Sequence, residues 1–173
     1  MEIRILTAAD AQVYSDLRLE ALATEPRAFS SSPADHLALS PEQIRERLQP
    51  ADSDGYPDTF VFGAFDAGKL VGTAGFWRER QPKLRHKGTI WGVYVAPPHR
   101  GRGLSRSLMA AALDRLHGYP DLRQVNLAVT ATQAPAERLY RSLGFEQFGY
   151  ERGALSVAGE WVDEYWMVLR LKD

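Results

Sequence analysis

Residues 93–109, VYVAPPHRGRGLSRSLM, contain the transition that decides the fold. The stretch GTIWGVYVA, residues 88–96, is rich in β-branched and aromatic residues and predicts a strand, which two prolines end. A loop with two glycines, residues 100–103, follows, and a helical pattern begins at once. Helix N-termini present unpaired N–H groups and a positive dipole end, and glycine lets a phosphate approach the backbone closely. The pattern favours an anion site, although a tight turn between strand and helix would also explain the glycines.

The charge distribution points to the same segment. Residues 78–106 carry eight basic residues and only Glu79 as an acid, a balance of +7, in a chain whose net charge is −1. Such a segment holds an anion, guides an acidic acceptor, or is a solvated basic hairpin. The loop is not a dinucleotide-binding fingerprint, because Arg106 stands where the third glycine would be, and no Gly-Lys-Ser/Thr sequence makes it a P-loop.

A second motif, VTATQAPAERLYRSLGF, occupies residues 129–145. A strand ends, and a helix over about 134–143 has Pro135 in its first turn and Gly144 just past its end. Tyr140 lies one helical turn after Ala136. The spacing alone allows Tyr140 to be either a core aromatic residue or a functional group.

Together the two motifs resemble those of the GNAT-type N-acetyltransferases. Arg100, Gly103 and Ser105 match that family's R/Q-x-x-G-x-G/A sequence with serine in the last place, and Gln133 stands where the second motif usually has asparagine. The resemblance covers residues 59–150 well, and it implies that acetyl-CoA binds where the fourth and fifth strands splay apart. The implied cofactor-binding residues are Val93, Tyr94, Val95, Arg100, Gly101, Arg102, Gly103, Leu104, Ser105, Arg106 and Gln133.

The resemblance also implies catalytic roles. Tyr140 would point its hydroxyl at the CoA sulfur and protonate the departing thiolate. Relatives often carry a glutamate on the fourth or fifth strand as the base, but residues 88–96 and 124–130 contain no acidic residue. Glu79 is a candidate base because it is the only acid in the basic segment. A water chain that relays the proton is an equal alternative, and the remaining side-chain candidates are His86, Glu20, Asp163 and Glu164.

Outward from these motifs, the spacing of apolar residues predicts the other elements. Strands are expected at residues 2–5, 59–66, 70–79, 124–129, 145–152 and 161–171, and helices at 10–23, from Ser40 onward and after the glycine loop. This order indicates an α/β or α+β fold. The resemblance specifies a single N-acetyltransferase domain over residues 1–173. Its mixed, mostly antiparallel central sheet would be flanked by helices and splayed between the fourth and fifth strands.

Length and composition agree with one globular domain. The 173 residues are 45% apolar and 25% charged, which supports a sizeable core. The chain has no cysteine, which excludes disulfides, thiolate metal sites and an acyl-cysteine intermediate. No HExxH sequence or clustered histidines occur, so we expect no metal. The start lacks the apolar stretch of a signal peptide and no apolar run is long enough for a bilayer, so we expect a cytoplasmic protein with no membrane partner.

These observations predict an enzyme that transfers an acetyl group from acetyl-CoA directly to a primary amine, expected to belong to a small molecule. Trp77, Trp91, Trp161 and Tyr165 could line an apolar pocket for this acceptor, although core packing would also explain them. Two alternatives remain open, namely a protein lysine or N-terminal acetyltransferase and a non-catalytic acyl-CoA-binding sensor. We expect no nucleic-acid partner. Homodimers are common in the family, so a homodimer is a further alternative.

Overall fold

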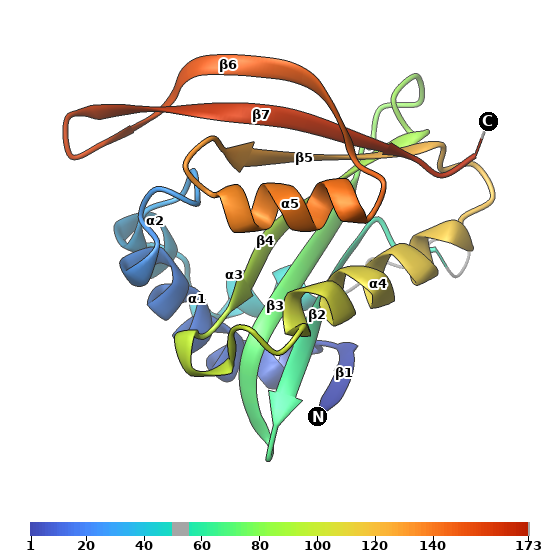
Figure 1. Ribbon diagram of the computed structural model, residues 1–173. Helices are drawn as coiled ribbons and strands as arrows, with labels where there is room; N and C mark the ends of the chain where they lie inside the picture. Colours follow the sequence, from blue (N-terminus) through green and yellow to red (C-terminus); the bar gives the residue numbers. More distant parts are fainter. Residues whose placement is uncertain (50–55, 173) are drawn as a thin grey trace.

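The computed structural model describes residues 1–49 and 56–172, which form one sheet of seven strands with helices on both faces (Figure 1). The strands are β1 (Glu2–Ile5), β2 (Thr59–Asp66), β3 (Lys69–Arg78), β4 (Lys87–Val95), β5 (Gln124–Thr130), β6 (Glu146–Val157) and β7 (Glu160–Arg170). The α-helices are α1 (Ala11–Thr24), α2 (Pro33–Leu37), α3 (Pro41–Leu48), α4 (Leu104–His117) and α5 (Ala134–Ser142), and 3-10 turns lie at Ala8–Asp10 and Pro97–His99.

The sheet is mixed and mostly antiparallel. Its strand order is β1-β2-β3-β4-β5-β7-β6, in which β4 and β5 run parallel and every other neighbouring pair is antiparallel. This arrangement confirms the predicted fold class.

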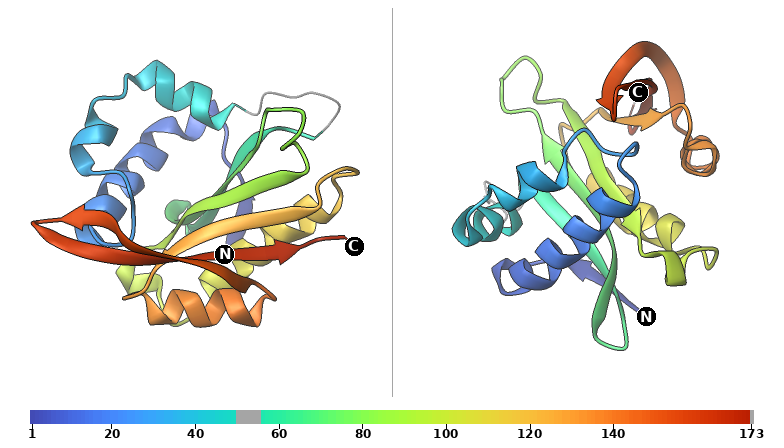
Figure 2. Two further views of the ribbon diagram at one scale, coloured as in Figure 1. Left: turned by 90° about the horizontal axis from the view of Figure 1, so that it is seen from above. Right: turned by 90° about the vertical axis from the view of Figure 1, so that its left-hand side faces the viewer.

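Helices cover the sheet in two layers, with α1, α2 and α3 on one face and α4 and α5 on the other (Figure 2). Helix α4 shows why its sequence favours this position. Leu104, Leu108, Ala112 and Leu116 recur every fourth residue and are all buried. The first two pack against small and β-branched residues of β2 and β3, and the last two join the core beneath β5. Within the described residues, no helix is long and apolar enough to cross a membrane.

The junction between β4 and β5 is the feature that creates a site. The two strands pair only from Lys87 to Thr89 on β4 and from Gln124 to Asn126 on β5. Beyond these residues β4 remains paired with β3, and β5 remains paired with β7. The strands therefore splay apart in the predicted place, and among the described residues the splay leaves this edge of β4 without a strand partner.

A β-bulge sharpens the bend of β4 at this point. The β3–β4 register shifts between Thr73, which faces Tyr94, and Gly75, which faces Trp91. Gly92 lies in the bulge with φ of +60°, a value that glycine adopts readily, and its carbonyl accepts a hydrogen bond of 3.0 Å from the Thr73 hydroxyl.

The largest difference from the predicted elements lies in the C-terminal hairpin. The strand expected at 145–152 extends to Val157, and its pairing with β7 is interrupted at 147–149 and at 151–155. Gly149 borders the first interruption and Gly153 lies within the second, so these glycines mark bulges inside the strand. The predicted turn at Ala158 and Gly159 is confirmed, because both residues have positive φ between β6 and β7.

Candidate active site

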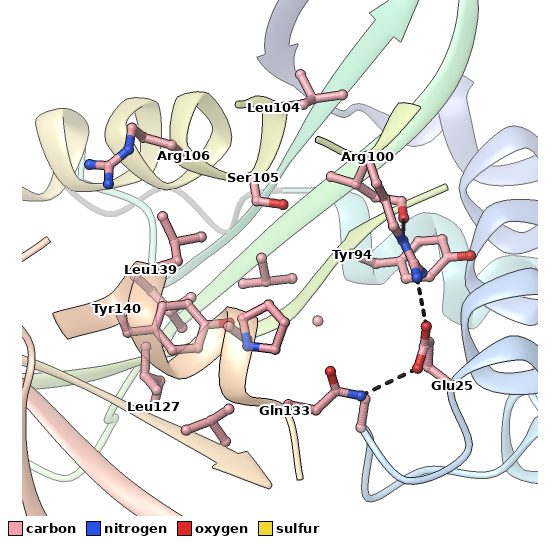
Figure 3. Close-up of a pocket in the computed structure, with 18 of the residues that line it drawn as sticks. Glu25, Tyr94, Arg100, Leu104, Ser105, Arg106, Leu127, Gln133, Leu139 and Tyr140 are labelled. Atoms are coloured by element: carbon pink, nitrogen blue, oxygen red, sulfur yellow. Dashed lines mark hydrogen bonds and ion pairs between the residues drawn. The ribbon is translucent and has the colours of Figure 1, made fainter. Parts of the chain in front are cut away.

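A cleft of about 490 Å³ opens where β4 and β5 separate. Its walls come from both strands, the start of α4, the start of α5 and the loop after α1. Figure 3 shows residues of these five segments facing the same space. Of the residues predicted from the two motifs, the structure brings together in this cleft Val93, Tyr94, Val95, Arg100, Gly101, Gly103, Leu104, Ser105, Arg106, Gln133 and Tyr140. The predicted residue Arg102 is exposed and does not border the cleft.

The end of the cleft at α4 is a backbone cradle. Gly101 and Gly103 have φ of +75° and +77°, and a Cβ atom added to either would find no other atom within 4 Å. Gly103 is the N-cap of α4, so the first N–H groups of this helix have no acceptor within it. Ser105 lies in that first turn. The cradle therefore offers open space, unpaired N–H groups and a positive helix end, which together suit a phosphate.

Glu25, in the loop after α1, links the two motifs across the cleft (Figure 3). One carboxylate oxygen is 2.8 Å from Nη1 of Arg100, and the other accepts a hydrogen bond of 3.3 Å from Nε2 of Gln133. Arg100 also donates from Nε to the Val95 carbonyl at 2.9 Å, which fixes the loop to the end of β4. Sequence reasoning missed Glu25, because its local context is only the end of a helix before a proline.

Tyr140 borders the cleft from α5 while most of its ring is buried. The ring packs beside that of Phe145, with 6.0 Å between centroids, in the core under β5. Burial raises the pKa of the Tyr140 hydroxyl above its ordinary value of 10.0. A group with a raised pKa keeps its proton at neutral pH, so Tyr140 can donate a proton and cannot serve as a base.

The structure places Glu79 outside this cleft. It borders a second, more open hollow with Asp58 and Arg47. Three other predicted candidates have different neighbours. Glu20 accepts a hydrogen bond of 2.9 Å from the Tyr94 hydroxyl, Asp163 accepts from Tyr150 and from the Gly153 amide, and Glu164 has a pKa raised by burial and by Glu151. Among the described residues that line the cleft, Glu25 is the acidic one.

The end of the cleft away from α4 is apolar. Ala28 and Phe29 of the loop after α1 line the cleft together with Trp91 and Gly92 of β4. Of the four aromatic residues expected around an acceptor, only Trp91 lines the cleft. Trp77 packs on Trp91 at 6.1 Å, Trp161 is 76% exposed, and Tyr165 packs beside Tyr150 at 5.5 Å.

The chain belongs to the acetyltransferase (GNAT) family, whose profile matches residues 19–145. The chain is 35% identical over 115 residues to the N-alpha-acetyltransferase RimI of Mycobacterium tuberculosis, and this match covers 64% of the chain and 66% of that protein. The fold is similar to that of a GNAT-family acetyltransferase from Streptococcus pneumoniae, with a TM-score of 0.87, 23% identity and 98% of each chain covered. It is also similar to a phosphinothricin acetyltransferase from Sinorhizobium meliloti in complex with acetyl-CoA, with a TM-score of 0.82, 22% identity, and 99% of this chain and 88% of that chain covered.

Proposed function

We propose that this protein transfers an acetyl group from acetyl-CoA directly to a primary amine of a small molecule. The observation that carries the proposal is the cleft at the β4–β5 splay, which has a phosphate cradle at one end, an apolar wall at the other and the buried Tyr140 hydroxyl beside it. A cleft with two chemically different ends suits two substrates bound together, as direct transfer requires.

The residues of the cleft fit acetyl-CoA. The open space at Gly101 and Gly103 and the α4 N-terminus suit the pyrophosphate. Among the described residues, the β4 edge from Val93 to Val95 has no strand partner on the cleft side, so its main-chain groups there, apart from the Val95 carbonyl that Arg100 holds, are available to the pantetheine amides. The side-chain amide of Gln133 would add a further hydrogen bond once it leaves Glu25. Acetyl-CoA, when bound, supplies the acetyl group as a thioester.

Two protons must move during the reaction, and their free energies differ. A lysine-like amine has a pKa near 10.4, so at neutral pH it lies roughly three pH units, about 4 kcal/mol, from its nucleophilic form. A thiol has a pKa near 8.5, so protonation of the thiolate involves only about 2 kcal/mol. Tyr140 is suited to the second proton, because it borders the cleft and its hydroxyl is protonated at neutral pH. A main-chain N–H near Val95 would stabilise negative charge on the carbonyl oxygen.

We propose that a chain of water molecules removes the proton from the amine and carries it to solvent. The paired part of β4 and β5 and the splayed part that follows contain no acidic residue. Glu79 lies in the other hollow, and Glu25 already holds Arg100 and Gln133. A relay lets the proton reach solvent without a dedicated side chain.

The apolar end of the cleft favours a small acceptor over a protein chain. Ala28 and Phe29 of the loop after α1 and Trp91 of β4 all line the cleft, so side chains bound the space for the acceptor. The likeness to an N-alpha-acetyltransferase makes an N-terminal amine the second candidate.

Release of CoA thiol from acetyl-CoA, measured with a panel of amines and peptides, tests the proposal. We expect turnover with at least one small amine and little with peptides. Turnover with peptides alone would favour the second candidate. Tight acetyl-CoA binding in calorimetry without any turnover would favour an acyl-CoA sensor.

A further inference from the structure

The carboxylate of Glu25 occupies two donors that an anionic cofactor would use. It accepts from Nη1 of Arg100 at 2.8 Å and from Nε2 of Gln133 at 3.3 Å, and all three residues line the cleft (Figure 3). Arg100 and Gln133 are cofactor-binding positions of the two family motifs. A phosphate or amide of the cofactor that takes these donor atoms displaces the carboxylate, and the negative charges also repel each other.

The contact of Glu25 with Arg100 is weak enough for a cofactor to break. The side chains of Glu25 and Arg100 are 28% and 44% exposed, so solvent screens their attraction. Acetyl-CoA carries several phosphate charges and can therefore compete for the guanidinium. Glu25 would then lose its contacts with both motifs, since the Gln133 amide also turns to the cofactor.

Helix α1 is held to β4 immediately before Glu25, by a side chain that stays in place when the donors change partner. The Tyr94 hydroxyl donates a hydrogen bond of 2.9 Å to Glu20, and its oxygen lies 3.1 Å from that of the Thr24 hydroxyl. These contacts fix the end of the helix. Movement that follows the release of Glu25 is therefore confined to the loop after α1.

This loop connects Glu25 directly to the acceptor end of the cleft. The Ala28 amide donates a hydrogen bond of 2.9 Å to the Glu25 carbonyl, so residues 25–28 form one turn. Ala28 and the next residue, Phe29, line the apolar end of the cleft. A displacement of the turn therefore changes the space that is available to the acceptor.

A second contact holds the same loop on the side away from the cofactor motifs. Arg27 pairs with Glu160, the first residue of β7, and neither residue lines the cleft. A cofactor in the cleft leaves this pair intact. The loop is therefore tied at two points only two residues apart, Glu25 and Arg27, of which the cofactor breaks one. Release of Glu25 lets the turn pivot and does not detach the loop.

We propose that Glu25 is a latch that acetyl-CoA opens, and that its release lets the loop of residues 25–29 admit the acceptor. This inference rests on the proposed function, because it takes acetyl-CoA as the cofactor of the cleft. While Glu25 holds Arg100 and Gln133, Ala28 and Phe29 restrict the apolar end. Once the cofactor takes these donors, the turn pivots and the apolar end widens. The amine therefore binds more tightly after acetyl-CoA than before it, since the two sites are coupled through the loop.

Amide hydrogen exchange, measured with and without CoA, tests the latch and needs no turnover. The proteins are the wild type, Glu25→Ala and Glu20→Gln. Glu20→Gln is the matched control, because Glu20 is an exposed carboxylate of the same helix that does not line the cleft. In the wild type, residues 101–106 should exchange more slowly with CoA, whereas residues 27–32 should exchange about 5-fold faster, the scale of a partly exposed ion pair.

The variants should separate the latch from a general effect of the cofactor. In Glu25→Ala, residues 27–32 should already exchange fast without CoA and should not change when it binds. Glu20→Gln should behave as the wild type does. Unchanged or slower exchange of residues 27–32 in the CoA-bound wild type would overturn the latch. If residues 101–106 also fail to respond to CoA, the cofactor site is wrong, and the proposed function fails together with the latch.

Kinetics and calorimetry distinguish a latch from a catalytic role of Glu25. At saturating acetyl-CoA the latch is open in the wild type as well, so kcat and the KM of the best amine from the panel should agree within about 2-fold with those of Glu25→Ala. Without a cofactor, that amine should bind about 5-fold more tightly to Glu25→Ala than to the wild type. Equal binding, or a large loss of kcat at saturation, would overturn the latch and leave acetyl transfer intact.

Discussion

The two ends of the cleft are built from different parts of the chain. The cofactor end comes from one continuous stretch, residues 93–106, and consists largely of main-chain groups at Gly101, Gly103 and the start of α4. The acceptor end combines side chains from the loop after α1 and from β4, among them Phe29 and Trp91. One end is local in sequence, and the other exists only after folding.

This difference bears on what each end can recognise. A cradle of N–H groups depends on a few glycines and a helix start, and it fits any phosphate of the right position. A wall of side chains changes its shape and charge with every substitution. We therefore expect cofactor binding to depend on backbone conformation and acceptor choice to depend on side chains.

The largest effect is expected at the cofactor end. Gly103→Glu places a side chain and a negative charge in the open space before α4. Acetyl-CoA affinity should fall at least 100-fold, because the N–H groups are blocked and the added carboxylate repels phosphate. Calorimetry measures the affinity, and circular dichroism shows that the fold is retained.

Gly68→Glu is the matched control for this prediction. Gly68 has a similar φ of +80° and equally open space, but it lies in the β2–β3 turn, away from the cleft. Both variants incur roughly 1 kcal/mol of backbone strain. If Gly68→Glu weakens acetyl-CoA binding as much, strain rather than the cradle is responsible.

The next largest effect is expected between the two ends, at Tyr140. Tyr140→Phe keeps the packing against Phe145 and removes only the hydroxyl. We expect kcat to fall about 10- to 1000-fold, the range of general-acid contributions, with little change in acetyl-CoA affinity. Steady-state kinetics and calorimetry report the two quantities.

Tyr119→Phe is the matched control, because it should change stability and leave catalysis unchanged. The Tyr119 hydroxyl donates a hydrogen bond of 2.7 Å to the Pro57 carbonyl in the core, away from the cleft. Its removal should lower the free energy of unfolding by about 1 kcal/mol and leave kcat unchanged. A Tyr140→Phe variant that behaved in this way would be only a core residue.

The difference between an end formed by one stretch of sequence and an end formed by several distant segments also explains how much the sequence could predict. The glycine loop, the start of α4 and the β4–β5 splay follow from residues 88–109 and from the family resemblance, and the structure has all three. Glu25 and Phe29 could not be placed, because their positions depend on how α1 packs on the sheet. The sequence favours Glu79 as a base because it is the only acid within a basic segment, but in the fold this residue borders the other hollow.

A smaller effect of opposite sign, tighter binding of acetyl-CoA, is expected when Glu25 loses its charge at the boundary between the two ends of the cleft. Its carboxylate holds Arg100 and Gln133 and lies where an anionic cofactor would run. Glu25→Gln keeps the size of the side chain and removes the negative charge. We expect acetyl-CoA to bind up to about 5-fold more tightly, the scale of a partly exposed ion pair, and the gain should shrink at high salt. Weaker binding would instead show that Glu25 positions the two motif residues for the cofactor.

The smallest effect is expected for Glu79, and it tests how the amine loses its proton. Glu79→Gln removes a carboxylate that borders the second hollow with Asp58 and Arg47, outside the cleft. If water relays the proton, kcat/KM should change less than about 3-fold. The acidic limb of the pH profile of kcat/KM should keep the midpoint set by the acceptor amine, because activity rises with pH as the free amine accumulates.

A base at Glu79 predicts a different pH profile for the variant, in which the rate falls more than about 100-fold, the acidic limb flattens and activity recovers partly at high pH. The pH dependence of kcat/KM, measured for the wild type and Glu79→Gln with two acceptors of different amine pKa, separates these cases. Under the relay the midpoint follows the acceptor, whereas a protein base holds it at one value for both.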